Sequence, residues 1–183
     1  MAILKMIRAE AKEDSQGNIV RKYPDNNARS DLIDYLTNPR KCVEIGGCGL
    51  YCPNAAYEMD LVAHSWGKDK GLRAYHWILS FSGKECERFG SSLINHMIAF
   101  AEFICDYIFS DGYQVVYAIH SQHLDHTHIH FVMNSVNFRT GKKFEGKKRD
   151  LYLFQKILGD HLKNCYGIQL MVVSSDEELE RYS

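Results

Sequence analysis

The chain has 183 residues, of which 45% are hydrophobic and 25% charged, with a formal net charge of −1. These values are ordinary for one globular domain that buries most of its apolar surface. The longest apolar tract, Met97–Phe109, is interrupted by Glu102 and Asp106 and is too short for a bilayer, so no membrane span is expected. The N-terminus also lacks a signal peptide, which predicts a cytoplasmic protein whose six cysteines are reduced and have no assigned role.

The predicted elements alternate between helices and strands without an internal repeat or a linker. A short apolar strand, Ala2–Ile7, comes first and is followed by a polar loop that runs through Asn27. Ser30 is the expected N-cap of a helix that ends at or before Asn38, because Pro39 cannot continue it. The later expected elements are a glycine-rich loop Gly46–Pro53, a helix Asn54–Trp66, a strand Tyr75–Phe81, a helix Arg88–Ser110, strands Tyr113–Ile119 and His128–Val136, a helix Leu151–Tyr166 and a strand Ile168–Val173. One α+β domain covering residues 1–183 accounts for this order.

Five of the chain's nine histidines lie between His120 and His130, where two strands are expected to meet through a short polar loop. Side chains alternate along a strand, so His128 and His130 share one face while Ile129 and Phe131 point the other way. His120 closes the preceding strand beside them. Three imidazoles that converge in this way predict a metal site.

A loose histidine-rich chelator on the surface is the alternative reading of this cluster. It is disfavoured because His128 and His130 sit within an apolar strand, where an imidazole without a partner is costly to bury. Imidazole ligands leave the metal open among zinc, manganese, iron, nickel and copper.

A basic run follows the histidine strand, although the net charge of the chain is close to zero. The segment Arg139–Arg149 holds six basic residues against the single Glu145. It predicts a local patch for phosphate groups, although a solvated turn is the plainer reading of such a run. The residues expected to contact phosphate groups are Lys142, Lys143, Lys147, Lys148 and Arg149 of this run, together with Arg40 and Lys41 earlier in the chain.

Tyr35 is a second chemical clue because Arg40 and Lys41 follow it closely and can hold a phosphate beside its phenol. A buried tyrosine is more often part of a core. Spacing alone cannot choose Tyr35 from the 11 tyrosines of the chain.

Four collinear segments resemble the successive motifs of plasmid and transposon relaxases, the mobilisation nucleases of the HUH endonuclease superfamily. They are DYLTNPRKC (Asp34–Cys42), YCPNAAYEM (Tyr51–Met59), AYHWILSF (Ala74–Phe81) and HSQHLDHTHIHFVMNSVNFRTGKKF (His120–Phe144). In this resemblance Tyr35 matches the family's tyrosine, and the histidine triad is matched by His120, His128 and His130, closed by Asn134. The implied fold is a central antiparallel sheet flanked by helices.

The resemblance implies a nuclease that nicks single-stranded DNA and its hairpin at an origin of transfer and later reseals it. Tyr35 would attack the phosphate to give a 5′-phosphotyrosine, with the charge offset by a divalent ion, Mn²⁺ or Mg²⁺, for which Zn²⁺ or Ni²⁺ could substitute in vitro. An ordinary phenol ionises near ~10, so a base is needed, and Asp125 and His126 are the candidates. Accessory relaxosome proteins and a coupling protein would be the partners, in a bacterial donor cell from which the protein could travel with the strand.

The match has departures that leave some roles open. Many relatives carry an acid where this chain has Gln122, and its task of fixing an imidazole tautomer could pass to Asp125. His123 or His126 could replace His120 as the third ligand. His76 could serve as a proton shuttle, a phosphate contact or a structural residue. Relatives also continue into further domains, so the chain is expected to be a minimal mobilisation protein or the N-terminal part of a longer one.

Two alternative functions stay open at this point. One is a replication initiator or a single-strand transposase of the same superfamily. The other is a protein that binds metal and single-stranded DNA without cutting it.

Overall fold

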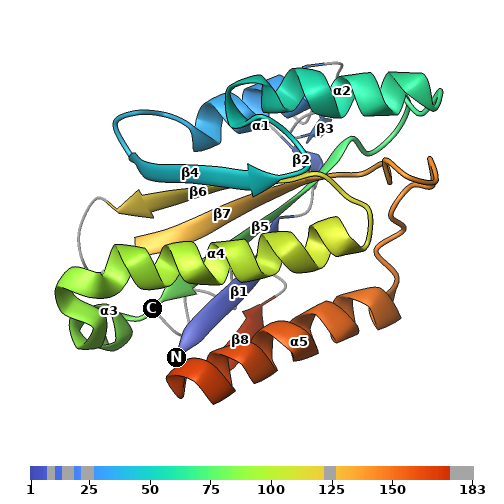
Figure 1. Ribbon diagram of the computed structural model, residues 1–183. Helices are drawn as coiled ribbons and strands as arrows, with labels where there is room; N and C mark the ends of the chain where they lie inside the picture. The colour runs from blue at the N-terminus through green and yellow to red at the C-terminus, as the bar shows by residue number, and fades with distance from the viewer. Residues whose placement is uncertain (8–10, 14–18, 22–26, 122–126, 174–183) are drawn as a thin grey trace.

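The computed structural model describes residues 1–7, 11–13, 19–21, 27–121 and 127–173. Six strands form one sheet in the order β4-β6-β7-β5-β1-β8 (Figure 1). The strands are β1 Ala2–Ile7, β4 Cys42–Cys48, β5 Ala74–Phe81, β6 Val115–Ser121, β7 Thr127–Asn134 and β8 Leu170–Val173, and a separate antiparallel pair is made by β2 Ala11–Glu13 and β3 Ile19–Arg21. The helices are α1 Ala28–Leu36, α2 Ala55–Ser65, α3 Gly83–Phe89, α4 Leu93–Ser110 and α5 Lys148–Tyr166, with short 3-10 turns at Cys52–Asn54 and Gly90–Ser92.

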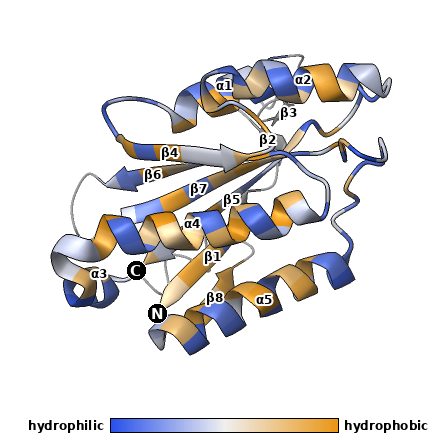
Figure 2. Ribbon diagram, in the orientation of Figure 1, coloured by the Kyte–Doolittle hydropathy of each residue, from blue (hydrophilic) through white to orange (hydrophobic). Residues whose placement is uncertain are grey.

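Helices cover both faces of the sheet. Figure 1 shows α1 and α2 over one face and α4 and α5 over the other. The larger apolar core lies on the α4 side and includes Ile129, Phe131 and Met133 of β7. A smaller core on the α1 side includes Val116, Ala118 and Val132. Figure 2 shows hydrophobic and hydrophilic stretches alternating along α4 and α5. β6 and β7 lie inside the sheet and nearly all of their residues are buried, so they are central strands with two buried faces.

The predicted fold class is confirmed. β4, β6, β7, β5 and β1 pair with one another in antiparallel fashion, and only β8 lies parallel to its neighbour β1. The parallel pairing at this edge is possible because α5 carries the chain back over the sheet before β8 begins. The long connections in the middle of the chain also place β4 next to β6 instead of next to β5.

Among the described residues, one helical stretch, Gly83–Ser110, is long and apolar enough to cross a membrane by length and composition. The α4 part of this stretch buries Met97, Phe100 and Ile104 in the larger core. An apolar helix that packs in this way against a sheet is the expected behaviour of a core helix.

Three sequence expectations in the N-terminal half are wrong. The segment expected to be a polar loop through Asn27 contains the paired strands β2 and β3. Ser30 is not the N-cap, because α1 begins at Ala28 and its N-cap position is Asn27. The earlier start places Arg29 inside the helix, where it is buried. Gly46 does not belong to a loop, because β4 runs from Cys42 to Cys48. A Cβ on Gly46 would come 2.5 Å from the Tyr117 hydroxyl, so this glycine makes room for a ring on the paired strand.

The helices on the α4 side also differ from the expectation in their bounds. The expected single helix Arg88–Ser110 is divided, because Gly90 adopts a φ of 53° that ends α3. The expected helix Leu151–Tyr166 begins three residues earlier, at Lys148. The end of the basic run therefore forms the first turn of α5.

A buried polar network joins α1 and α2 to the end of β7. Arg29 is 0% exposed; its guanidinium pairs with Asp60 of α2 and donates a hydrogen bond of 3.0 Å to Asn134 Oδ1. The Asn134 amide in turn donates to the Met59 carbonyl at 3.1 Å and to Gln114 Oε1 at 2.9 Å. Each of these partners offsets part of the cost of burying the others.

Replacing Asn134 with Ala should lower the free energy of unfolding by about 2–4 kcal/mol, because it removes the hydrogen-bond partner of Arg29 Nη2 and of Gln114 Oε1 inside the protein. The control is Asn95→Ala, at an exposed position of α4. This substitution should change the free energy of unfolding by less than about 0.5 kcal/mol. Urea unfolding followed by circular dichroism measures both. Equal stability of the two variants would contradict the role given to the network.

Candidate metal and nucleophile site

The three histidines of the predicted triad meet on the face of the sheet that α1 covers. His120 of β6 lies directly opposite His128 of β7, and Ala118 lies opposite His130. Their candidate ligand atoms all lie within 4.8 Å of one another. No other group of three such side chains with this spacing occurs in the parts of the chain that the structure describes.

Hydrogen bonds determine which ring nitrogens can receive an ion. His120 Nε2 lies 2.7 Å from the carbonyl oxygen of Leu36; since a carbonyl can only accept, Nε2 carries the proton and Nδ1 is bare. His130 Nδ1 contacts His76 Nε2 at 2.8 Å, while His130 Nε2 is buried without a hydrogen-bond partner. A buried nitrogen without a partner is costly, and a bound metal ion would satisfy it.

Burial keeps two of these imidazoles, those of His120 and His130, in the neutral form that metal binding requires. Desolvation lowers the pKa of His130 to about 2, with a further lowering from the neighbouring histidines and Lys41. Burial also lowers the pKa of His120, although its bond to the Leu36 carbonyl opposes the shift. Both rings are therefore neutral at pH 7, with lone pairs available for an ion.

Tyr35 lies beside the triad. It occupies the last turn of α1, and its ring centroid is 5.7 Å from that of His130 and 6.3 Å from that of His120. The side chain is 45% exposed, so its phenol is open to a substrate from solvent. The Lys41 ammonium is 5.9 Å from the centroid of the Tyr35 ring. Its positive charge can bind a phosphate next to the phenol.

Helix α1 is attached to the sheet at both ends, which explains the position of Tyr35. Arg29 in its first turn bonds to Asn134, and the Leu36 carbonyl at its end accepts from His120. Leu32, Ile33 and Leu36 pack between them in the smaller core. The Leu36 contact could not be predicted from the sequence, because the backbone carbonyl makes it and its side chain does not. Arg29 could have been found, because it precedes Leu32, Ile33 and Leu36 by three, four and seven residues on one helix face.

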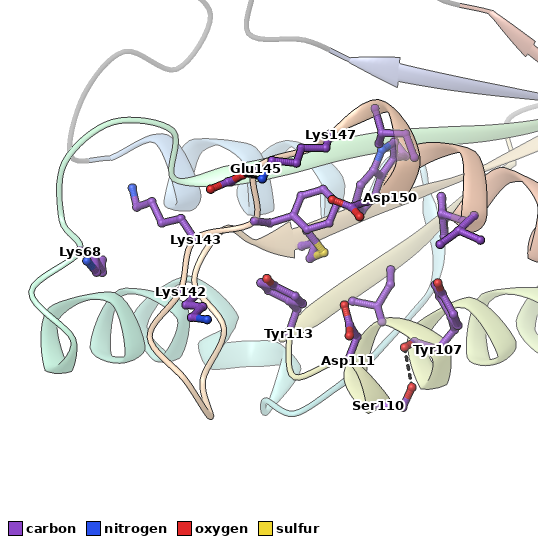
Figure 3. Close-up of a pocket in the computed structure, with 17 residues that line it drawn as sticks. Lys68, Tyr107, Ser110, Asp111, Tyr113, Lys142, Lys143, Glu145, Lys147 and Asp150 are labelled. Atoms are coloured by element: carbon purple, nitrogen blue, oxygen red, sulfur yellow. Dashed lines mark hydrogen bonds and ion pairs between the residues drawn. The ribbon is translucent and has the colours of Figure 1, made fainter.

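The basic run lies at the opposite end of β7 from the triad. His128 and His130 are near the start of β7, whereas the run follows its end at Asn134. Lys142, Lys143 and Lys147 line a cavity of about 980 Å³ with Tyr107 and Tyr113 (Figure 3). Trp77 and Met133 also line this cavity, which places it on the α4 side of the sheet.

The basic side chains have different surroundings. The Lys143 ammonium donates to the carbonyls of Lys70 and Leu72, and burial lowers its pKa. Lys147 forms an ion pair with Glu145. Arg40, Lys142, Lys148 and Arg149 are exposed, and of these Arg40 lies in the turn that joins α1 to β4, near Tyr35.

Four residues considered for catalysis or metal binding, Gln122, His123, Asp125 and His126, lie outside the described residues. The roles considered for them stay predictions. Among the described side chains the triad is completed by His120.

Comparison with known proteins agrees with this arrangement. A family model described as "Relaxase: MobA/VirD2-like, nuclease domain" matches residues 35–168, a segment that begins at Tyr35 and includes the whole triad. Protein rlx of Staphylococcus aureus is 29% identical over 116 residues, which cover 61% of this chain and 32% of that protein. The chain thus matches about a third of the length of this relative. Because the family model covers most of the chain, the protein belongs to the relaxase family with a MobA/VirD2-like nuclease domain.

Proposed function

We propose that the protein is a metal-dependent DNA strand transferase, which nicks single-stranded DNA at an origin of transfer and rejoins it during conjugative mobilisation. The observation that carries the proposal is the position of Tyr35 beside the imidazole triad, with its ring centroid 5.7 Å from that of the buried His130. A partly exposed nucleophile beside a group of neutral imidazoles suits attack on a phosphodiester.

The reaction proposed for Tyr35 is an in-line displacement at phosphorus. Its phenolic oxygen forms a bond to the scissile phosphorus as the bond to the 3′ oxygen breaks. The phenol proton passes to a base, for which Asp125 and His126 are proposed, and the departing 3′ oxygen takes up a proton to become a hydroxyl. The reverse reaction can rejoin the strand, because the phosphotyrosine ester conserves the energy of the phosphodiester bond that was broken.

The triad would hold a divalent ion through His120 Nδ1, His130 Nε2 and one ring nitrogen of His128. When bound, the ion would neutralise negative charge on the phosphate oxygens during the displacement. Three imidazoles favour Mn²⁺, Zn²⁺ or Ni²⁺ over Mg²⁺, which prefers oxygen ligands. Lys41 and Arg40 would hold the phosphate next to Tyr35.

The wider biological setting of the protein is also a proposal. Its DNA partner would be the single strand and hairpin of an origin of transfer, read with the help of accessory relaxosome proteins and a coupling protein. Nicking of the DNA strand would take place in the cytoplasm of a bacterial donor cell. A replication initiator or transposase would share the chemistry, and an origin-specific nicking assay separates these functions.

Replacing Tyr35 with Phe should abolish the covalent protein–DNA adduct on a denaturing gel after incubation with Mn²⁺ and a cognate oligonucleotide. Affinity for the same oligonucleotide should change less than about threefold, which is less than about 1 kcal/mol. Tyr57→Phe, at an exposed position of α2, is the matched control and should retain the adduct. An adduct formed by Tyr35→Phe would show that another residue is the nucleophile.

Replacing His128 with Ala should lower metal affinity at least about 100-fold in calorimetric titrations with Mn²⁺ or Zn²⁺, because it removes one of three ligands. Nicking should be lost in parallel. His64→Ala serves as the control, since His64 is exposed on α2. His120→Ala, His123→Ala and His126→Ala, measured in the same way, identify the third ligand. Metal-dependent cleavage by His128→Ala would remove the triad from the chemistry.

Neutralising Lys41 and neutralising Lys142 should affect DNA binding differently, because these lysines lie at opposite ends of the sheet. Lys41→Gln should weaken binding of a short oligonucleotide that covers only the nick site, whereas Lys142→Gln should weaken only a longer strand. Each should reduce the slope of log affinity against log salt by about 0.7, the value for one lost contact to a single strand. Fluorescence anisotropy measures both. Unchanged binding of the longer strand by Lys142→Gln would exclude Lys142 from the DNA contacts.

A further inference from the structure

His76 and His130 form a buried pair on neighbouring strands. His76 lies on β5, opposite Val132 of β7, so His130 is its diagonal neighbour on the same face of the sheet. Their rings are 5.1 Å apart between centroids and inclined by 26°. His76 Nε2 is 2.8 Å from His130 Nδ1, and the two residues are 5% and 1% exposed. The contact is therefore a hydrogen bond shielded from water.

The direction of this hydrogen bond follows from the triad. A neutral imidazole has one N–H and one bare nitrogen, so one ring must donate and the other must accept. His130 Nε2 is the nitrogen without a protein partner, and it can bind an ion only if it is bare. The proton of His130 then resides on Nδ1, and His76 Nε2 accepts it.

We propose that His76 is a positioning residue, which fixes the tautomer and the ring orientation of His130 so that Nε2 faces the ion. This inference rests on the proposed metal site. In metal sites this orienting task is usually performed by a carboxylate, a carbonyl or water. The sequence has Gln122 where an acid was expected, and the structure offers a different residue, from another strand, for the same task.

The geometry argues against two other roles for His76. It is not placed as a fourth ligand, because its Nε2 faces Nδ1 of His130, on the far side of that ring from Nε2. It is also more than a space-filling residue, since Phe would fill a similar volume without the acceptor that His130 Nδ1–H requires.

A neutral orienting residue has a consequence for the charge of the site. A carboxylate would donate negative charge to the ligand set and weaken the attraction between a bound cation and a phosphate. The hydrogen bond from His130 to the neutral imidazole of His76 fixes the His130 ring without adding negative charge. In the part of the chain that the structure describes, the cationic Lys41 also lowers the pKa of His130, and its positive charge suits the site to an anionic substrate.

Three proteins test the proposal by calorimetric titration with Zn²⁺ and Mn²⁺: wild type, His76→Phe and His76→Gln. His76→Phe keeps a ring but loses the acceptor, and should lower metal affinity about 10- to 100-fold. His76→Gln keeps an acceptor oxygen and should recover most of that loss. Trp77→Phe, on the same strand but in the larger core, is the control and should bind metal as wild type does.

The tautomer gives a second readout that packing alone would not change. ¹⁵N NMR of the imidazole rings of the wild-type protein should show the proton of His130 on Nδ1, with and without Zn²⁺. Metal affinity in His76→Phe equal to that of wild type, or a proton found on His130 Nε2, would overturn the inference while leaving the proposed function intact. Absence of metal binding by wild type would instead refute the metal site itself.

Discussion

The register between β6 and β7 is the constraint on which the rest of the molecule depends. It places His120 opposite His128 and Ala118 opposite His130, with all of these side chains on the face beneath α1. The intervening residues, such as Ile129 and Phe131, fill the larger core on the opposite face. A slip of β7 by one residue against β6 would exchange its two faces. Its histidines would then lie under α4, and its core residues would lie under α1. One set of backbone hydrogen bonds therefore specifies both the core and the chemistry.

Helix α1 then brings Tyr35, the proposed nucleophile, to that face in a fixed position. Its first turn is held by Arg29 and its last by the Leu36 carbonyl, with Tyr35 at the end that meets the triad. Functional side chains are placed most accurately when they stand on rigid elements with buried support. The Tyr35 ring is nevertheless half exposed, so the backbone is held firmly where the side chain must meet a substrate. Asn134 follows the histidines in sequence but has a different role, because it belongs to the buried hydrogen-bond network that holds the start of α1.

Much of this could be predicted from periodicity. Alternation along residues 128–134 separated the histidines from the core, and the spacing of Met97, Phe100 and Ile104 predicted α4. Gly46 was misread because a glycine that accommodates a cross-strand ring has the same signature as a turn. The basic run follows the histidine strand in sequence but not in space, because a strand moves its two ends apart by about 3.3 Å per residue. Tyr35 could be selected only through a family resemblance, since phenols carry no spacing signal.

The outermost strands of the sheet have a consequence for association between copies of the protein. Exposed strand edges can pair with other chains and seed aggregates. Here β4 changes register between Cys42 and Glu44, with Val43 turned out to 50% exposure, and two glycines follow within the same strand. Within the described residues, β8 at the other edge spans Leu170–Val173. The irregular edge of β4 is a poor template for intermolecular β-pairing, which disfavours growth of the sheet from that side.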